Sequence, residues 1–500
     1  MGMASTRDPS KIFFLFVLIL TTLRLIFLAT NPLDLAPDEA YYWDWSRHLD
    51  VGYYSKPPLI AWIIWFGTHL FGPTELGVRF PALLLGTLSL IILFRFTRQL
   101  FGDEVALWAT LLSGLTVGAA IGSFIMTIDA PLILFWTLAL LAAWNAIGHG
   151  EGRRPLWWLT AGVATGLGLL SKQTMIAFPA LFFLYLLSDK GLRRHLLTPW
   201  PYIAFFIAIF MLSPTIYWNM DHGWITILHT KHHFDPNRGG LIDGLKTFGE
   251  LFGALFGLLT PVTFCLILMG SSWAGRPSNL LDLKKRYLFF MGPMPLGLIL
   301  LLSLHQRVNP NWPGPFFITS TILAALWAIK LDHKKALRAG VAVSIVITSI
   351  LYAAPYILPH TPLSGGGLDP FRRLMGWEEL GRAMTDTAQQ AGWPREIPYI
   401  FTFPRQNVSE LAFYMEGQPR IHLWRLPDGI KNQYSIWDSP LKHKRPFRAL
   451  LVKPDGRSLK PSQIYLFKEI RPVRHIKVPI SPRYSRGYWV YVGEYDPHAR

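Results

Sequence analysis

The sequence has little cysteine and little charge for its length. A single cysteine, Cys265, occurs among 500 residues, and only 16% of the residues are charged whereas 51% are hydrophobic. One cysteine excludes an intramolecular disulfide framework and any zinc cluster built from several thiolates. In soluble domains close to a quarter of the residues are charged. We therefore predict a polytopic membrane protein that is mainly α-helical.

The few charges that are present are unevenly divided between the two signs. The chain has 48 Lys and Arg against 31 Asp and Glu, which gives a formal net charge of +17. Such an excess suits nucleic acid, but no RNP-like motif, zinc-finger spacing or basic heptad accompanies it. In membrane proteins an excess of Lys and Arg marks cytoplasmic loops that face anionic lipid. We therefore expect membrane lipids, and no nucleic acid, among the partners.

About eleven apolar stretches are candidates for membrane spans, because a crossing helix needs about 20 mostly apolar residues. The first is long for the core of a signal peptide and no small-residue cleavage site clearly ends it, so we expect a retained helix. The stretch 59–71 is too short to cross easily and fits an interfacial or re-entrant helix. The predicted spans are 12–30, 78–100, 104–122, 125–147, 156–171, 173–188, 200–218, 244–271, 287–305, 312–330 and 338–357.

The basic residues between the spans predict the orientation of the chain in the membrane. A cytoplasmic N-terminus and strict alternation place every tight basic cluster on the cytoplasmic side, as the positive-inside rule requires. The agreement supports both the number of spans and its parity. The clusters are Arg95 and Arg98, Arg153 and Arg154, Lys190 with Arg193 and Arg194, Arg276 with Lys284 to Arg286, and Lys334 with Lys335 and Arg338.

The same alternation places a long first loop and the C-terminal region outside the cytoplasm, in the manner of a bacterial inner-membrane protein. We expect a membrane domain over 1–358, with the loop 31–77 as its functional part, and a small α/β domain over 359–500. In the latter, IPYIFTF, RALLVK and RGYWVYVGEY read as strands and NVSELAFYM as a helix.

Ionisable residues gather on the predicted outer face, and five separate loops supply them. For each one alone, a solvated or snorkelling side chain is an equally good explanation, HTKHH is more often a solvated loop than a metal site, and the loop aromatics fit an interfacial belt. Those explanations do not account for the convergence of acids, cations and imidazoles on one face. The candidates are Asp38, Glu39, Lys56, Asp129, Lys172, His229, His232, Arg238, His305 and Arg307.

A pair of acids beside several cations at a membrane boundary suits a reaction on an anionic lipid. Asp38 can orient an attacking hydroxyl or accept its proton. Lys56 and Arg238, with Lys172, can neutralise a phosphate and so stabilise a leaving group. The prolines after Lys56 restrict the backbone there.

Five motifs, in this order along the chain, resemble the membrane-integral glycosyltransferases of family 39. They are DEAYYWDWSRHLDVGYYSKPPLIAW, VRFPALLLG, TIDAP, LLSKQT and NPNWP. This family includes protein O-mannosyltransferases and the bacterial aminoarabinose transferases of lipid A, and the likeness covers roughly residues 10 to 330. The resemblance implies a GT-C fold and an inverting transfer of a sugar from a polyprenyl-phosphate donor to a lipid, glycan or protein acceptor.

The resemblance also implies roles for individual residues. Asp38 would lie nearest the acceptor with Glu39 beside it, Asp129 would be a second acid that lines the site, and Lys56 would contact the donor phosphate. One position departs from the family. The aminoarabinose transferases have a glutamate, associated with a metal, immediately before the lysine, and here that residue is Ser55. A hydroxyl is a poor zinc ligand, so the need for a divalent metal stays open.

Two other functions compete with the transferase. A transporter or flippase of a lipid-linked intermediate would place charges near the middle of the bilayer and often shows paired repeats, and neither is clear in this sequence. A non-catalytic scaffold that presents the C-terminal domain would not require the acids and the lysine of the first loop. The sequence therefore favours the transferase.

Overall fold

The structure is a computed structural model that describes residues 8–148, 154–231, 240–424, 429–442, 445–459 and 461–497. The chain forms two compact units, which we describe separately. The first, here called the helical unit, comprises Met1–Ala29, Lys56–Ile60 and Arg79–Tyr352. The second, the loop–sheet unit, comprises Thr30–Ser55, Ala61–Val78 and Ala353–Arg500. Most of the first loop thus groups with the C-terminal region by its contacts, whereas Lys56–Ile60 group with the helical unit.

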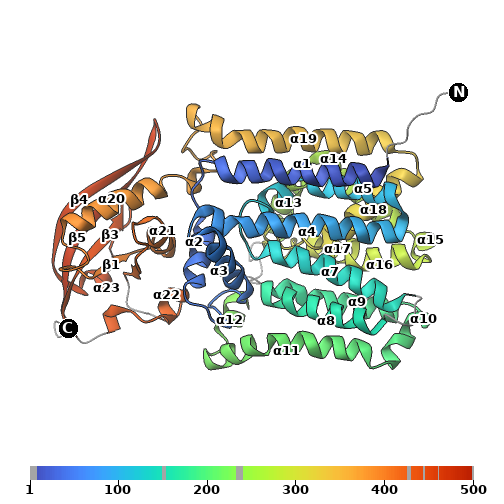
Figure 1. Cartoon of the computed structure of the whole chain (residues 1–500), viewed down its shortest axis with the longest axis horizontal. Coiled ribbons are helices and arrows are strands. Elements are labelled where there is room, and N and C mark those ends of the chain that lie inside the picture. Colours follow the sequence, from blue (N-terminus) through green and yellow to red (C-terminus); the bar gives the residue numbers. More distant parts are fainter. Residues whose placement is uncertain are drawn as a thin grey trace. The chain divides into compact units, whose positions relative to one another are not determined.

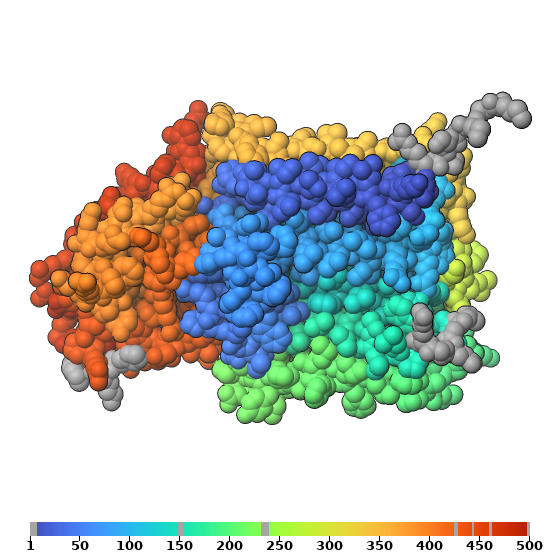
Figure 2. All heavy atoms as spheres, in the orientation of Figure 1, coloured from blue at the N-terminus to red at the C-terminus, as the bar shows by residue number. Residues whose placement is uncertain are grey.

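The helical unit consists of long apolar helices that run along a common direction (Figure 1). Apolar side chains of α1, among them Phe14 and Leu18, and of α11, among them Phe206 and Phe210, are exposed on its surface, where Figure 2 shows both helices. Such a surface suits lipid. The helices are α1 Pro9–Thr30, α4 Glu75–Phe101, α5 Asp103–Gly114, α6 Val117–Gly122, α7 Asp129–Ile147, α8 Arg154–Ser171, α9 Ala177–Leu187, α10 Lys190–Arg193, α11 Trp200–Asp221, α12 Ile225–Lys231, α13 Gly240–Leu258, α14 Pro261–Ala274, α15 Pro277–Leu280, α16 Leu283–Met291, α17 Pro293–Leu302, α18 Phe316–Lys330 and α19 Lys334–Ile357.

Each of the predicted spans falls on a helix or on a pair of helices. Within the described residues, six helical segments are long and apolar enough to cross a membrane, and eight are if each bent pair counts as one span. The chain is therefore a multi-pass membrane protein, while the predicted number of eleven spans stays a prediction. The remaining predicted spans correspond to helices that are short or interrupted: α5 with α6, α8 and α18.

The predicted span 244–271 is two helices and not one. The structure bends by 111° between α13 and α14. Thr260 has a φ of 66°, which a β-branched residue rarely adopts, and Pro261 follows it without an N–H group. The Thr260 hydroxyl is buried and lies 2.7 Å from the Ser344 hydroxyl of α19. A tertiary contact thus fixes a break that the apolar pattern of the sequence does not reveal.

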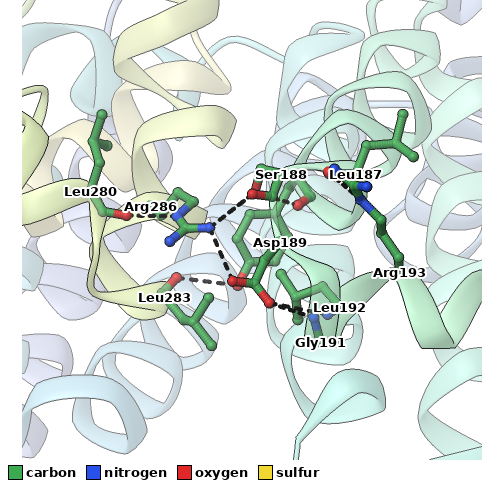
Figure 3. Close-up of polar contacts among 10 residues, drawn as sticks. Leu187, Ser188, Asp189, Gly191, Leu192, Arg193, Leu280, Leu283 and Arg286 are labelled. Atoms are coloured by element: carbon green, nitrogen blue, oxygen red, sulfur yellow. Dashed lines mark hydrogen bonds and ion pairs between the residues drawn. The ribbon is translucent and has the colours of Figure 1, made fainter.

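Several of the predicted basic clusters lie at the same end of the helical unit. Arg286 of α16 donates a hydrogen bond of 3.2 Å to the Ser188 carbonyl, which follows α9, and lies 3.6 Å from the Asp189 carboxylate (Figure 3). Lys284 donates a hydrogen bond of 2.8 Å to the Leu100 carbonyl of α4. These contacts bring the basic residues at 284–286 next to the ends of α4 and α9, beside the clusters at 95–98 and 190–194, as the predicted topology requires.

The loop–sheet unit contains a mixed five-stranded sheet with the strand order β2-β1-β3-β5-β4. β1 pairs in parallel with β2 and β3, and β5 pairs antiparallel with β3 and β4. α20 and α21 pack on each other and contact the sheet. The elements are α2 Pro37–Ser46, α3 Leu59–Phe71, which is shared between the two units, α20 Trp377–Gln390, β1 Tyr399–Thr402, α21 Arg405–Tyr414, β2 His422–Leu423, α22 Gln433–Ile436, β3 Phe447–Pro454, α23 Pro461–Ile464, β4 Phe467–Ser481 and β5 Tyr484–Tyr495.

The three predicted strands and the predicted helix of this unit are confirmed as β1, β3, β5 and α21. The sequence analysis did not predict the longest strand, β4. This strand is basic and contains Pro472 and Pro479, which argue against a strand when they are read in sequence alone. It lies at the edge of the sheet, where proline and lysine are tolerated because one side of the strand has no partner to bond.

Close helix packing in the helical unit depends on glycine. A Cβ atom added to Gly162 of α8 would lie 2.6 Å from the Ala204 carbonyl oxygen of α11, whereas one added to Gly253 of α13 would meet no atom within 4 Å. We expect Gly162→Ala to lower the free energy of unfolding by about 1–3 kcal/mol, because the opposing atom is backbone and cannot move aside. Gly253→Ala, the matched control, should leave it unchanged or raise it by up to about 1 kcal/mol.

Unfolding of the purified protein in detergent measures both variants. Equal stability of the Gly162→Ala variant and the wild type would contradict the close approach of α8 and α11.

Candidate active site

The first loop carries its acidic pair on a short helix. Pro37 occupies the first turn of α2 and leaves no N–H group unpaired there. Asp38 and Glu39 follow, near the positive end of the helix dipole. Glu39 accepts a hydrogen bond of 2.9 Å from the backbone N–H of Ala36, in a capping-box arrangement. Its side chain is fully buried, so its carboxylate stabilises the start of the helix.

The aromatic residues of α2 fix the position of the helix. Tyr41, Trp43 and Trp45 are each at most 1% exposed. The Trp43 ring contacts that of Phe413 in α21 edge-on, with 4.8 Å between the centroids. The sequence analysis interpreted these aromatics as an interfacial belt, but the three that are buried cannot rest among lipid headgroups. Their burial instead packs the loop against the C-terminal region within the loop–sheet unit.

Asp38 points away from this packed core and meets an arginine that lies far along the chain. Arg405 of α21 donates a hydrogen bond of 2.8 Å from Nη2 to the Oδ1 atom of Asp38. The side chain of Asp38 is 59% exposed and that of Arg405 33% exposed. The Arg405 guanidinium also lies 4.2 Å from the centroid of the Tyr41 ring. Burial lowers the pKa of Arg405, but the charge of Asp38, its hydrogen bond and the neighbouring tyrosines together raise this pKa by more, so the net shift is upward.

A second polar cluster forms in the helical unit, from three of the motifs that carry the family resemblance. Lys172, which follows α8, donates a hydrogen bond of 2.7 Å to the Oδ1 atom of Asp129 at the start of α7. Asn311, which precedes α18, donates one of 2.9 Å to Oδ2. The side chain of Lys172 is 7% exposed and that of Asp129 24%. TIDAP, LLSKQT and NPNWP therefore meet, as the predicted topology required.

The remaining candidates lie on other segments of the chain. Lys56 is half-buried just before α3, and His229 is half-buried in α12. His305 is exposed, and Arg307 pairs with Glu250 across 3.2 Å on the surface. His232 and Arg238 lie outside the described residues. The roles assigned to all these residues stay predictions.

A metal site finds no support among the described residues. Within them, no group of three or more His, Cys, Asp or Glu side chains is placed so that it could hold a metal ion. Ser55 is half-buried and offers only a hydroxyl. We therefore derive no step of the reaction through a metal.

Two residues of the site were not predicted from the sequence. Arg405 pairs with Asp38, and Gln433 accepts a hydrogen bond of 2.7 Å from the backbone N–H of Tyr54 in the loop. Both residues are more than 350 positions from their partners in the sequence. An isolated arginine after proline and an isolated glutamine form no motif, so only the fold identifies them.

An acidic group is buried at the start of the loop. Asp34 is 7% exposed and accepts a hydrogen bond of 2.7 Å from the backbone N–H of Trp377. Burial raises the pKa of Asp34 to about 7, against the opposing effect of that hydrogen bond, and the nearby carboxylate of Glu75 adds to the rise. Tyr414 donates a short hydrogen bond to Glu75 and accepts one of 2.6 Å from the Leu35 N–H.

Comparison with solved structures defines the class of fold. The crystal structure of ArnT from Cupriavidus metallidurans bound to undecaprenyl phosphate matches with a TM-score of 0.66 and 16% identity, over 96% of this chain and 97% of that one. The oligosaccharyltransferase AglB from Archaeoglobus fulgidus matches with a TM-score of 0.51 and 13% identity, over 83% of this chain and 65% of that one. Both likenesses show the GT-C fold.

Comparison with known sequences defines the family. A family model described as dolichyl-phosphate-mannose-protein mannosyltransferase matches residues 55–218. The lipid A galacturonosyltransferase RgtD of Rhizobium johnstonii is 30% identical over 431 residues, 84% of this chain and 86% of that enzyme. An undecaprenyl phosphate-alpha-4-amino-4-deoxy-L-arabinose arabinosyl transferase of Pseudomonas savastanoi is 29% identical over 31% of this chain and 30% of its own length.

The fold and the sequence together define a membrane-integral glycosyltransferase. The chain belongs to the family of membrane-integral GT-C glycosyltransferases that includes the Rhizobium johnstonii enzyme.

The Asp129–Lys172 pair can be tested through stability. Lys172→Met would leave the Asp129 carboxylate without its cation, and we expect it to lower the free energy of unfolding by about 3 kcal/mol. Asp129→Asn in the same chain should recover part of this loss, because the two effects are coupled. Lys334→Met is the control, since Lys334 forms an exposed pair with Glu104 and should cost at most about 1 kcal/mol. Strictly additive effects at 129 and 172 would contradict the pair.

The raised pKa of Asp34 predicts a pH dependence of stability. Between its ordinary value of 3.8 and about 7, the folded state binds the proton more tightly than the unfolded state, so stability falls as the pH rises through this window. The fall is worth up to about 4 kcal/mol. Asp34→Asn should flatten it, since an amide can accept the same hydrogen bond and does not ionise. Thermal midpoints of the wild type and the Asp34→Asn variant at pH 5 and pH 8 measure the difference. An identical pH dependence in the two proteins would refute the prediction.

Proposed function

We propose that this enzyme transfers a sugar from a polyprenyl-phosphate donor to lipid A, and that the sugar is a uronic acid. The observation that carries the proposal is the 30% identity with a lipid A galacturonosyltransferase over most of both chains. The arabinosyl transferases that use an undecaprenyl-phosphate donor are similar over only about a third of this chain. Their similarity to this chain supports a polyprenyl-phosphate donor but does not identify the sugar.

In the proposed reaction, a hydroxyl of the acceptor attacks the anomeric carbon of the sugar. A carbon–oxygen bond to the acceptor forms and the bond from the anomeric carbon to the donor phosphate breaks, with inversion. Asp38 takes the proton of the hydroxyl, and the polyprenyl phosphate leaves with its charge stabilised by Lys56. The exposure of the Asp38 carboxylate supports its role, because a general base must be open to its substrate.

The proposal includes the orientation in the membrane. The basic end of the helical unit, with Arg286 and Lys284, faces the cytoplasm, as the positive-inside rule predicts. The loop 31–77 and the C-terminal region then lie on the outer side. By the family resemblance, Asp129 is a further candidate acid, and Lys172 and Arg238 are further candidates for the donor phosphate.

A transfer assay tests the function directly. The purified protein is mixed with lipid A and with either undecaprenyl-phosphate galacturonate or undecaprenyl-phosphate aminoarabinose, and mass spectrometry detects glycosylated lipid A. We expect a product with the uronic acid donor. Asp38→Asn should lower kcat by about 10²–10⁴-fold, because the amide cannot accept the proton.

Asp103→Asn is the matched control. Asp103 pairs with Arg98 near the C-terminal end of α4, and its replacement should leave transfer unchanged. Product from the aminoarabinose donor alone would overturn the choice of sugar, and full activity of the Asp38→Asn variant would remove Asp38 from catalysis.

A further inference from the structure

The two oxygens of the Asp38 carboxylate have different surroundings. Oδ1 accepts the 2.8 Å hydrogen bond from Nη2 of Arg405. Among the residues that the structure describes, no contact is found for Oδ2, and the side chain as a whole is 59% exposed. One oxygen is therefore held by the protein while the other is open. A carboxylate that is held in this way cannot rotate freely, so its open oxygen keeps one direction.

Arg405 is itself held in place from two sides. It is the first residue of α21, and the helix is anchored by buried residues such as Phe413. Its guanidinium lies over the ring of Tyr41, 4.2 Å from the centroid, which is a cation–π contact. Tyr41 is 1% exposed, and its hydroxyl accepts a hydrogen bond of 2.6 Å from the backbone N–H of Gln433. The arginine thus has little freedom to follow a mobile carboxylate.

Gln433 connects this arrangement to the other end of the loop. Its side-chain oxygen accepts the hydrogen bond of 2.7 Å from the backbone N–H of Tyr54, two residues before Lys56. Gln433 is 1% exposed. A single buried residue therefore binds both the helix that carries Asp38 and the segment that leads to the proposed phosphate ligand. The C-terminal region thus holds the loop at both of these points.

We propose that Arg405 is a positioning residue for glycosyl transfer: it holds Oδ1 of Asp38 so that Oδ2 faces the acceptor hydroxyl. Gln433 supports it by fixing Tyr41, the ring on which Arg405 rests. The inference rests on the proposed function, because it assigns Arg405 to the same reaction. It makes the C-terminal region part of the catalytic apparatus.

A purely structural role for the ion pair is a weaker explanation. Exposed ion pairs add little to stability, and α2 is already held by its buried aromatic side chains. The loss of Arg405 should therefore leave the fold intact and reduce the rate. A substrate-binding role makes a different prediction, since it would raise KM and leave kcat largely unchanged.

Kinetics of the full-length protein in detergent, with undecaprenyl-phosphate galacturonate and lipid A, separate these explanations. We expect Arg405→Ala to lower kcat about 10–100-fold with KM values within about twofold of the wild type. Arg405→Lys should recover part of kcat, because an ammonium can still hold Oδ1. Arg382→Ala is the control, as Arg382 pairs with Glu378 on the exposed side of α20, and it should be fully active.

The double variant Asp38→Asn/Arg405→Ala gives the decisive comparison. If Arg405 acts through Asp38, the double variant is no slower than Asp38→Asn alone. Multiplied effects would overturn the inference, as would a raised KM at normal kcat, or a lowered thermal midpoint that explains the loss of activity. A normal Arg405→Ala variant beside an impaired Asp38→Asn variant refutes the inference and leaves the proposed function standing. An active Asp38→Asn variant refutes both the role of Asp38 and the inference.

Discussion

The burial of the aromatic side chains of α2 is the interaction on which the candidate site depends. A ten-residue helix is too short to be stable by itself in water, so its position is set by what its side chains contact. Tyr41, Trp43 and Trp45 are buried, and Asp38, in the first turn of the helix, stays exposed. The same packing brings α21 beside α2, and with it Arg405. The acid and its cation are therefore placed by aromatic side chains that take no part in the chemistry.

The helical unit follows a different constraint, the cost of charge within a membrane. Its ionisable groups gather at the helix ends, and the two ends differ. One end holds Lys and Arg that bond to backbone carbonyls and to Asp189, whereas the cluster made by three of the motifs holds the carboxylate of Asp129 between Lys172 and Asn311. A basic end suits anionic headgroups. A carboxylate that is fixed by a cation and an amide suits a binding site that must keep its shape.

The sequence predicted much of the fold because the relevant patterns are local. Apolar runs identified the helices, alternation identified β1, β3 and β5, and the basic clusters brought the correct helix ends together. The failures have physical reasons. The break at Thr260 depends on a contact with Ser344, the edge strand β4 tolerates prolines that would exclude a central strand, and the aromatics of α2 are buried by a helix that lies more than 350 residues away. In each case a tertiary contact overrides an expectation drawn from the local sequence.

By itself the sequence determined the class of the protein, the stretches that form its apolar helices and the acids and lysines worth considering, since length, hydropathy and charge act over short stretches. It also determined which motifs carry the family resemblance. Only the tertiary structure decided how these residues are used. It paired Lys172 with Asp129, turned Glu39 inward as a helix cap, and gave Asp38 the partner Arg405. Such pairings depend on which distant residues become neighbours in space. The local sequence does not reveal this, because the burial of apolar side chains in the folded chain decides it.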